Sequence, residues 1–452
     1  IAVGNLAGAD PATLQADITR DKAIDDNAFQ VELATVVENS FNIHQDGLRL
    51  VFREEENPQA KLMACARNDK LFADGSDLAQ LAKEGVQLER IYGYPVCSPA
   101  RSALLTGMMP RRFGLTDVVG PGQQGIPKGT PTLASTLQSA GYRTSLIGKW
   151  HLGTNPGPLG YGFDHFYGFL GPEIDYFTHL NQRGVIDWTR DGKTVEEKGY
   201  ATTLIADEAI AQLKQRDRRK PFYMQVAFNA PHTPLAAPAE LIAKYKSDAL
   251  YTAVIEGLDI GIGRILASLD EQGLRANTVV VFCSDNGATR RFSPNTPLSF
   301  GKGTVQEGGI RVPAIVRWPG KVAAGVLSQQ PVAAHDLFPS LLAALGLPIP
   351  EKLKFDGSNQ WPALSTGKTL PRPAFLIAAR DIAFFDGEWK IIETSEGKRS
   401  LYNLRTDLGE SKDVLASQPE LAAKLGAQLD ALKQGLPAVT AGGAGKGAGK
   451  GA

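Results

Sequence analysis

The 452-residue sequence is poor in cysteine, has no excess of either charge and contains no long apolar run. Its three cysteines, Cys65, Cys97 and Cys283, allow at most one internal disulfide, which excludes a disulfide-built scaffold. Lys and Arg together number 48, and so do Asp and Glu, so no net charge attracts nucleic acid. Because no stretch approaches about 18 apolar residues, we expect no membrane span.

Helical and strand-like patterns alternate between residues 71 and 345. Helices are expected over residues 78–84, 131–140 and 251–272, and strands over residues 144–147, 221–228 and 278–283. Thr130 is the expected N-cap of the second helix, with Pro131 at its first position. The run 278–283 is continuously apolar, which predicts a parallel strand buried on both faces. The alternation predicts an α/β sandwich.

The pattern changes after about residue 370. Asp386-Gly387 lies between two apolar runs, which is a hairpin signal. A further strand is expected over residues 400–404 and a closing helix over residues 419–434. These elements predict a small antiparallel subdomain.

The motif Cys-x-Pro-x-Arg, from Cys97 to Arg101, runs into a short apolar stretch that can open a helix. A chance match is expected about once in a hundred chains of this length and composition. The simplest alternative is a buried cysteine before a turn-forming proline, because free cysteine is among the most buried residue types.

Polar residues also follow predicted strands or lie in a glycine-rich loop. Lys149 and His151 follow the strand 144–147, at the sheet edge where open α/β sheets bind ligands. His232 follows the strand 221–228, and its simpler role would be structural. An exposed lysine and a helix-capping histidine are the corresponding alternatives for Lys149 and His151.

Two further segments complete the pattern. Asp285 and Asn286 directly follow the apolar run 278–283 and offer oxygens that suit a hard cation such as Ca²⁺, although Asp-Asn-Gly also forms ordinary Asx turns. Lys302 lies in the glycine-rich segment 301–313, where an unspecialised loop lysine is the alternative.

Over roughly residues 71–435 these motifs together resemble the sulfatase family. The resemblance implies an alkaline-phosphatase-like α/β sandwich, with a large central mixed, mostly parallel sheet between helices and a small C-terminal antiparallel sheet. The expected divisions are an atypical N-terminal region (1–70), a sulfatase catalytic domain (71–369), a C-terminal α+β subdomain (370–440) and a disordered Gly/Ala/Lys tail (441–452).

The resemblance also implies a chemistry. Cys97 would be oxidised to Cα-formylglycine by a formylglycine-generating enzyme, and one hydroxyl of the aldehyde hydrate would attack the sulfur of a sulfate ester. A sulfated intermediate would remain, and the second hydroxyl would then expel sulfate. His232 would protonate the departing alcohol and His151 would accept a proton.

The remaining roles follow from the charge of the substrate. A sulfate monoester is an anion, so cations must gather around its oxygens. The resemblance assigns this task to Lys149 and Lys302 as sulfate-binding residues, together with His232, while the fixed fork of Arg101 stabilises residue 97. Asp285 and Asn286 would be two of the ligands of Ca²⁺.

One part of the family pattern is missing. Sulfatases usually carry an Asp-Asp pair after their first strand, about 40 residues before the cysteine. Asp25-Asp26 lies in a helical context 72 residues before Cys97, and the strand-like segment 61–69 ends in Arg67-Asn68-Asp69. Neither copies the pattern, and two oxygen ligands are fewer than the six or more that Ca²⁺ prefers.

The sequence therefore predicts a sulfatase acting on a sulfated carbohydrate or an aryl sulfate, in the arylsulfatase and N-acetylgalactosamine-sulfatase branch. A phosphonate or phosphate monoester hydrolase of the same superfamily is the second hypothesis, and a non-catalytic glycan-binding relative is the third. No Asn-x-Ser/Thr acceptor occurs, and the first residue is Ile1, as after removal of a signal peptide. Both features favour a periplasmic or secreted bacterial protein.

Overall fold

The computed structural model describes residues 43–46, 49–52, 76–120, 122–246, 249–290, 295–351 and 353–438. It divides into two compact units, residues 1–75 and 76–452. In the first unit, strands β1 (Ile43–Asp46) and β2 (Arg49–Phe52) form an antiparallel pair. The acidic pair Asp25-Asp26, the segment 61–69 and the tail 441–452 lie outside the described residues.

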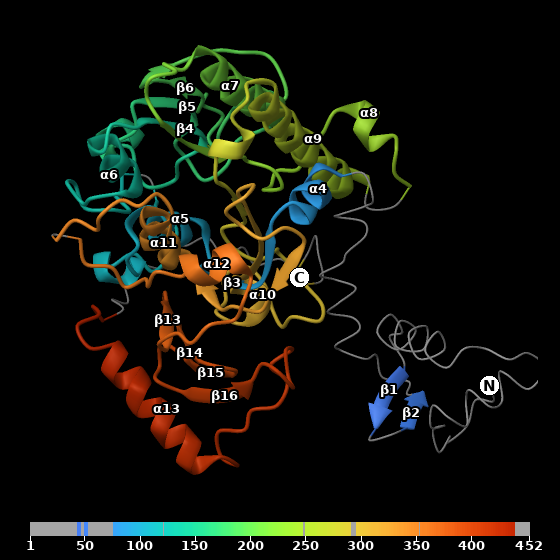
Figure 1. Cartoon of the computed structure of the whole chain (residues 1–452), viewed down its shortest axis with the longest axis vertical. Helices are drawn as coiled ribbons and strands as arrows, with labels where there is room; N and C mark the ends of the chain where they lie inside the picture. The colour runs from blue at the N-terminus through green and yellow to red at the C-terminus, as the bar shows by residue number, and fades with distance from the viewer. Residues whose placement is uncertain are drawn as a thin grey trace, which may run out of the picture. The chain divides into compact units, whose positions relative to one another are not determined.

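Two five-stranded mixed sheets form the centre of the second unit (Figure 1). One sheet has the order β11 (Val326–Ser328), β3 (Val86–Tyr92), β10 (Arg311–Arg317) and β9 (Val280–Cys283), and β12 (Val332–Ala333) also pairs with β3. The other sheet has the order β7 (Lys193–Thr194), β6 (Thr189–Arg190), β5 (His165–Phe169), β4 (Arg143–Lys149) and β8 (Phe222–Ala227).

Strand β4 pairs in parallel with β5 on one side and with β8 on the other. Its residues from Thr144 to Lys149 are all buried. Gly148 has a φ of 106°, and a Cβ there would lie 2.0 Å from the carbonyl oxygen of Ala227 on β8. Only glycine allows the backbone this conformation and this close approach. The strand therefore delivers Lys149 to the sheet edge on a rigid support.

The helices cover these sheets. Helices α7 (Ala201–Gln215) and α9 (Ala249–Glu271) lie side by side in Figure 1, and Gly261 on α9 lets Ala206 on α7 approach closely. The other helices are α4 (Asp77–Lys83), α5 (Cys97–Thr106), α6 (Leu133–Ser139), α8 (Ala239–Ile242), α10 (Glu307–Ile310), α11 (Leu337–Ala344) and α12 (Trp361–Thr366). Short 3₁₀ turns occur at Pro110–Phe113, Pro158–Tyr161, Arg275–Asn277 and Ala334–Asp336.

A separate antiparallel sheet of four strands forms the C-terminal part, with helix α13 (Pro419–Leu432) against it (Figure 1). Leu425 and Leu429 of α13 pack into the cluster that contains Phe384 and Ile391 of the sheet. The predicted hairpin and closing helix are confirmed, and the two residues of the hairpin turn are Gly387, with a φ of 60°, and Glu388. The strands are β13 (Phe375–Ala378), β14 (Ile382–Asp386), β15 (Trp389–Glu393) and β16 (Arg399–Asn403).

Two local predictions were wrong. Helix α6 is capped by Thr132, not Thr130, because the Thr132 hydroxyl accepts a bond from the Ser135 amide and the Ser135 hydroxyl accepts one from the Thr132 amide. Thr130 and Thr132 flank the same proline, and only Thr132 forms this reciprocal capping box with Ser135. The apolar run 278–283 is also not a doubly buried parallel strand, since β9 pairs antiparallel with β10 and its residues are half-buried.

The α/β class with a small separate antiparallel sheet is confirmed, because the two mixed sheets and the C-terminal sheet are both present. Within the described residues, no helix combines the length and the apolar character that crossing a bilayer requires.

Candidate active site

Cys97 is the first residue of helix α5, and its side chain is 2% exposed. Val96 before it is extended, and Gly107 in the left-handed region ends the helix. The Ser98 hydroxyl donates to the carbonyl oxygen of His151 at 2.9 Å, which ties this helix start to the chain beyond β4. The amide groups at a helix N-terminus favour negative charge, so residue 97 occupies a position suited to an anion.

Lys149 and His151 approach Cys97 from the end of β4. Both side chains are buried, and His151 has a φ of 54°, a conformation uncommon for a residue with a side chain. Arg101, one turn into α5, donates from Nη1 to the carbonyl oxygen of Lys149 at 2.8 Å and from Nη2 to Asp285 Oδ2 at 3.3 Å. Arg101 therefore links the ends of β4 and β9 behind residue 97.

Lys302 and His232 complete the ring around Cys97. The Lys302 ammonium donates to Cys97 Sγ at 3.5 Å and lies 3.0 Å from His232 Nε2. The backbone of the Lys302 loop is held at both sides, since Lys302 N donates to Ala288 O and Gly303 N donates to Pro95 O. Residues far apart in the sequence thus meet around one sulfur atom.

The segment 307–311 supports this loop. Arg311 Nη1 lies 3.4 Å from Glu307 Oε2, and a Cβ on Gly309 would lie 2.1 Å from the carbonyl oxygen of Thr304. The ion pair and the close backbone packing are both present. Glu307 is fully buried and also accepts from Lys390 Nζ of β15 at 2.8 Å, which anchors the loop to the C-terminal sheet.

The electrostatics of the site favour an anion at residue 97. Burial by itself raises the pKa of the Cys97 thiol, but the charge of Lys149 and the nearby His151 and His232 side chains hold that pKa well below its usual value. Burial lowers the pKa of His151, so its imidazole is neutral at neutral pH and able to accept a proton. Burial also lowers the pKa of Lys149, although the negative charges of Cys97 and Asp285 act to raise it.

Asp285 and Asn286 follow β9 as predicted. The Asn286 Oδ1 atom is buried without a hydrogen-bond partner, and the Asp285 carboxylate faces the site through Arg101. These two oxygens suit a hard cation, but among the described residues no cluster of three or more His, Cys, Asp or Glu side chains accompanies them. The two oxygens are fewer than the six or more that Ca²⁺ prefers.

Sequence reasoning missed Glu173, whose Oε2 atom lies 3.4 Å from His232 Nδ1. It belongs to the irregular segment between β5 and β6, where one acidic residue carries no spacing signal. The same nitrogen lies 2.7 Å from the carbonyl oxygen of Thr233. The structure thus adds a carboxylate to the candidate site residues.

A cysteine at a helix start thus lies among three cationic side chains and two histidines, an arrangement that favours an anion. The sequence model of the sulfatase family matches residues 70–347, more than half of the chain. This chain belongs to the sulfatase family.

Known proteins with similar sequences and structures agree with that assignment. The chain is 35% identical to human N-acetylgalactosamine-6-sulfatase over 66% of this chain and 62% of that protein, and 33% identical to mouse arylsulfatase J over 65% and 52%. It therefore spans less than two thirds of the length of these relatives. A solved structure of Ps i-CgsB in complex with k-i-k-neocarrahexaose superposes with a TM-score of 0.75 at 29% identity, covering 81% of this chain and 90% of that one.

Proposed function

We propose that this protein hydrolyses sulfate monoesters and that residue 97 acts as formylglycine. One observation carries the proposal: Lys149, His151, His232 and Lys302, from three separate segments, all surround the side chain of residue 97 at the start of α5. Formylglycine in its hydrated form would supply two hydroxyls, one to attack sulfur and one to release sulfate.

The residues around it divide the remaining work. Lys302 and Lys149 neutralise the sulfate oxygens, and the helix start adds its amides to the same task. His232 presents Nε2 towards residue 97 and delivers a proton to the departing alcohol, while the neutral His151 accepts one when sulfate leaves. Arg101 of α5 donates hydrogen bonds to the Lys149 backbone and to Asp285, and so fixes their positions relative to residue 97.

The proposed substrate is a sulfated carbohydrate. Support comes from a relative named N-acetylgalactosamine-6-sulfatase and from a structural neighbour solved in complex with k-i-k-neocarrahexaose. Maturation would require a formylglycine-generating enzyme, and we place the protein in the bacterial periplasm or outside the cell. Detection in the periplasmic fraction after expression of the native gene tests that placement.

We further propose that Asp285 and Asn286 bind Ca²⁺, which would add positive charge beside the sulfate oxygens. The support is the carboxylate of Asp285 and the unpartnered buried oxygen of Asn286. Its ligand set extends beyond these two residues, since two oxygens are too few for this ion.

The experiment is a comparison of ester substrates. Protein co-expressed with a formylglycine-generating enzyme should turn over p-nitrophenyl sulfate, and Cys97→Ala should not. Faster turnover of an aryl phosphonate ester than of the sulfate would favour the phosphonate or phosphate hydrolase hypothesis. Binding of sulfated glycans without any turnover by fully converted protein would replace the enzyme with a glycan-binding relative.

A further inference from the structure

The loop 299–307, which carries Lys302, is closed at its base by a residue from the C-terminal part of the chain. Glu410 lies in the segment between β16 and α13. Its Oε2 atom accepts a hydrogen bond from the Glu307 amide at 2.7 Å and another from the Ser299 hydroxyl. Ser299 precedes Lys302 in the chain and Glu307 follows it, so one carboxylate oxygen joins the two ends of the loop.

The backbone at this junction has an unusual conformation. Phe300, next to Ser299, has a φ of 57°, and Glu410 itself has a φ of 52°. The Gly308 amide donates to the Ser299 carbonyl oxygen at 2.8 Å, which closes the loop a second time. Left-handed backbone is uncommon for residues with a side chain and persists where surrounding contacts hold it. Two such residues therefore adjoin the contact between Ser299 and Glu410.

Glu410 makes these contacts as a buried anion. Its side chain is 8% exposed, and the Lys390 ammonium lies 2.7 Å from Glu410 Oε1 and 2.8 Å from Glu307 Oε1. One oxygen of the carboxylate therefore binds the loop while the other faces a buried cation. A glutamine at this position would keep the shape of the side chain, but it would remove the charge that pairs with Lys390.

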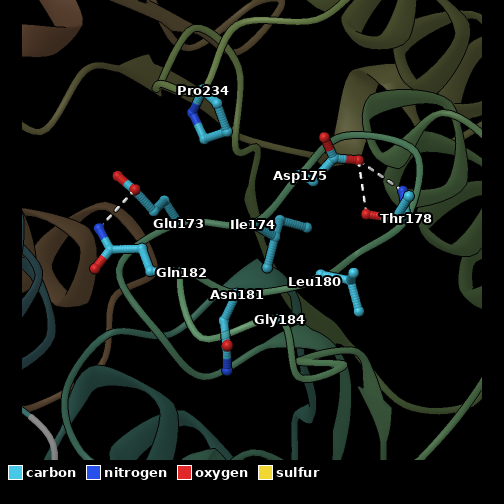
Figure 2. A pocket seen from close by; sticks show the side chains of 9 residues that line it. All are labelled: Glu173, Ile174, Asp175, Thr178, Leu180, Asn181, Gln182, Gly184 and Pro234. Carbon is cyan, nitrogen blue, oxygen red and sulfur yellow. Dashed lines mark hydrogen bonds between the residues drawn. The ribbon is translucent and has the colours of Figure 1, made fainter.

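His232, which contacts Lys302 across the site, is held separately. Glu173 Oε2 lies 3.4 Å from His232 Nδ1, and Gln182 Nε2 donates to Glu173 Oε1 at 2.7 Å, as the dashed line in Figure 2 shows. Both of these supporting residues belong to the segment between β5 and β6. A change at Glu410 should therefore act on Lys302 and leave the support of His232 in place.

We infer that Glu410 is a positioning residue for Lys302, so that the C-terminal part of the chain sets the place of a lysine that binds the sulfate oxygens. The inference rests on the proposed sulfatase function. The Lys302 ammonium lies 3.5 Å from Cys97 Sγ and 3.0 Å from His232 Nε2, so a shift of the loop base changes both distances. Glu410 acts through the two ends of the loop.

A first test needs no turnover. In unconverted protein, burial raises the pKa of the Cys97 thiol, and the charges of Lys149 and Lys302 lower it. Glu410→Gln should displace Lys302 and so raise the pH at which the ultraviolet absorbance of the thiolate appears. Lys302→Met should raise it as well, and the double variant should match Lys302→Met. An unchanged titration in Glu410→Gln, or a further rise in the double variant, overturns the inference.

The same pair of substitutions in converted protein separates positioning from a general weakening of the fold. Glu410→Gln should lower kcat/KM for p-nitrophenyl sulfate by about 10- to 100-fold, the effect of moving a group by about 1 Å. Added to Lys302→Met, it should cause a further loss of less than about twofold. An equal loss in the wild-type and Lys302→Met backgrounds overturns the positioning role.

A second variant and a matched control complete the design. Ser299→Ala removes one bond between the loop and Glu410 but keeps the ion cluster, so it tests the junction even if Glu410→Gln folds poorly. It should shift the thiolate titration in the same direction, and not in the Lys302→Met background. The control is Glu208→Gln, a carboxylate with the same 8% exposure that pairs with Arg190 in the other sheet. A shift in the control as large as in Glu410→Gln overturns the inference.

The outcomes separate this inference from the function on which it rests. Converted wild-type protein that hydrolyses no sulfate ester overturns the proposed function, and the thiolate titration still decides whether Glu410 positions Lys302. Normal turnover by the wild type, with an unchanged titration in both Glu410→Gln and Ser299→Ala, overturns the positioning role alone.

Discussion

At the scale of single residues, one side chain is approached by cations from several parts of the chain. Lys302 lies 3.5 Å from Cys97 Sγ, Lys149 lowers the pKa of the same thiol, and Arg101 braces the arrangement from within α5. Buried like charges of this kind oppose folding unless an anion joins them. The cluster therefore favours negative charge at residue 97, as the proposed function requires.

Replacing Lys302 with methionine removes one of these charges while retaining most of the side-chain volume. We expect kcat for p-nitrophenyl sulfate to fall by about 100- to 1,000-fold, the usual effect of losing one group that stabilises transition-state charge. The free energy of unfolding should change little. Lys412→Met, at an exposed site, is the matched control and should leave kcat unchanged. Near-normal turnover by Lys302→Met would remove Lys302 from the mechanism.

Unconverted protein offers a second residue-scale prediction. The depressed pKa of the Cys97 thiol means that the ultraviolet absorbance of a thiolate should persist at pH values well below about 8.5, the usual thiol pKa. Cys97→Ser should lack this signal.

Protein stability should follow the same titration. Between the folded and unfolded pKa values the unfolded state binds more protons, so wild-type stability relative to Cys97→Ser should fall as the pH drops through the folded pKa. Thiolate absorbance that vanishes at the usual thiol pKa would show that the cations do not act on Cys97.

At the scale of elements, a buried ion cluster joins the active-site loop to the C-terminal sheet. Lys390 of β15 is fully buried, and its ammonium lies 2.8 Å from Glu307 and 2.7 Å from Glu410. Glu307 begins α10, five residues after Lys302. The C-terminal sheet thus contributes to the position of Lys302, which it does not itself carry.

Lys390→Met should lower the free energy of unfolding by about 3–5 kcal/mol, because it leaves the buried Glu410 without its cation and leaves Glu307 with Arg311 alone. Urea denaturation measures the change. Lys244→Met breaks an exposed pair with Glu256 and serves as the control, with an expected cost of about 1 kcal/mol or less. A Lys390→Met variant as stable as the control would show that the cluster does not hold the sheet and the loop together.

Elements with strong local signals were predictable from the sequence. The hairpin at Gly387 and the helices α9 and α13 depend on neighbouring residues, and the sequence located them to within a few positions. The pairing of β9 was not predictable, since an apolar run fits a parallel or an antiparallel neighbour equally well. Glu173 was missed for a related reason: its partner His232 lies 59 residues later in the sequence, and only the fold brings the two together.

At the scale of the whole molecule, two mixed sheets and a C-terminal sheet present the site. The ends of β4, β8 and β9 supply Lys149, His232 and the pair Asp285-Asn286, and the Lys302 loop closes the set. Family membership made these motifs recognisable, but their convergence on residue 97 is a property of the fold. The acidic pair of the family pattern has no counterpart among the described residues.

Calcium binding is a molecule-scale prediction that does not depend on activity. Adding Ca²⁺ to chelator-treated protein should raise the unfolding midpoint, because a ligand that binds only the folded state stabilises it. Asn286→Ala should weaken this response, whereas Asn359→Ala, at a remote exposed position, should retain it. An identical response in both variants would show that Asn286 is not a ligand.

The most direct test of the central claim is the rate of p-nitrophenyl sulfate hydrolysis as a function of the fraction of Cys97 converted to formylglycine. Peptide mass spectrometry measures the converted fraction, since conversion lowers the mass of the segment that carries residue 97. The account predicts a rate proportional to that fraction and indistinguishable from zero for unconverted protein. Hydrolysis by the unconverted cysteine form, or inactivity of fully converted protein, would contradict it.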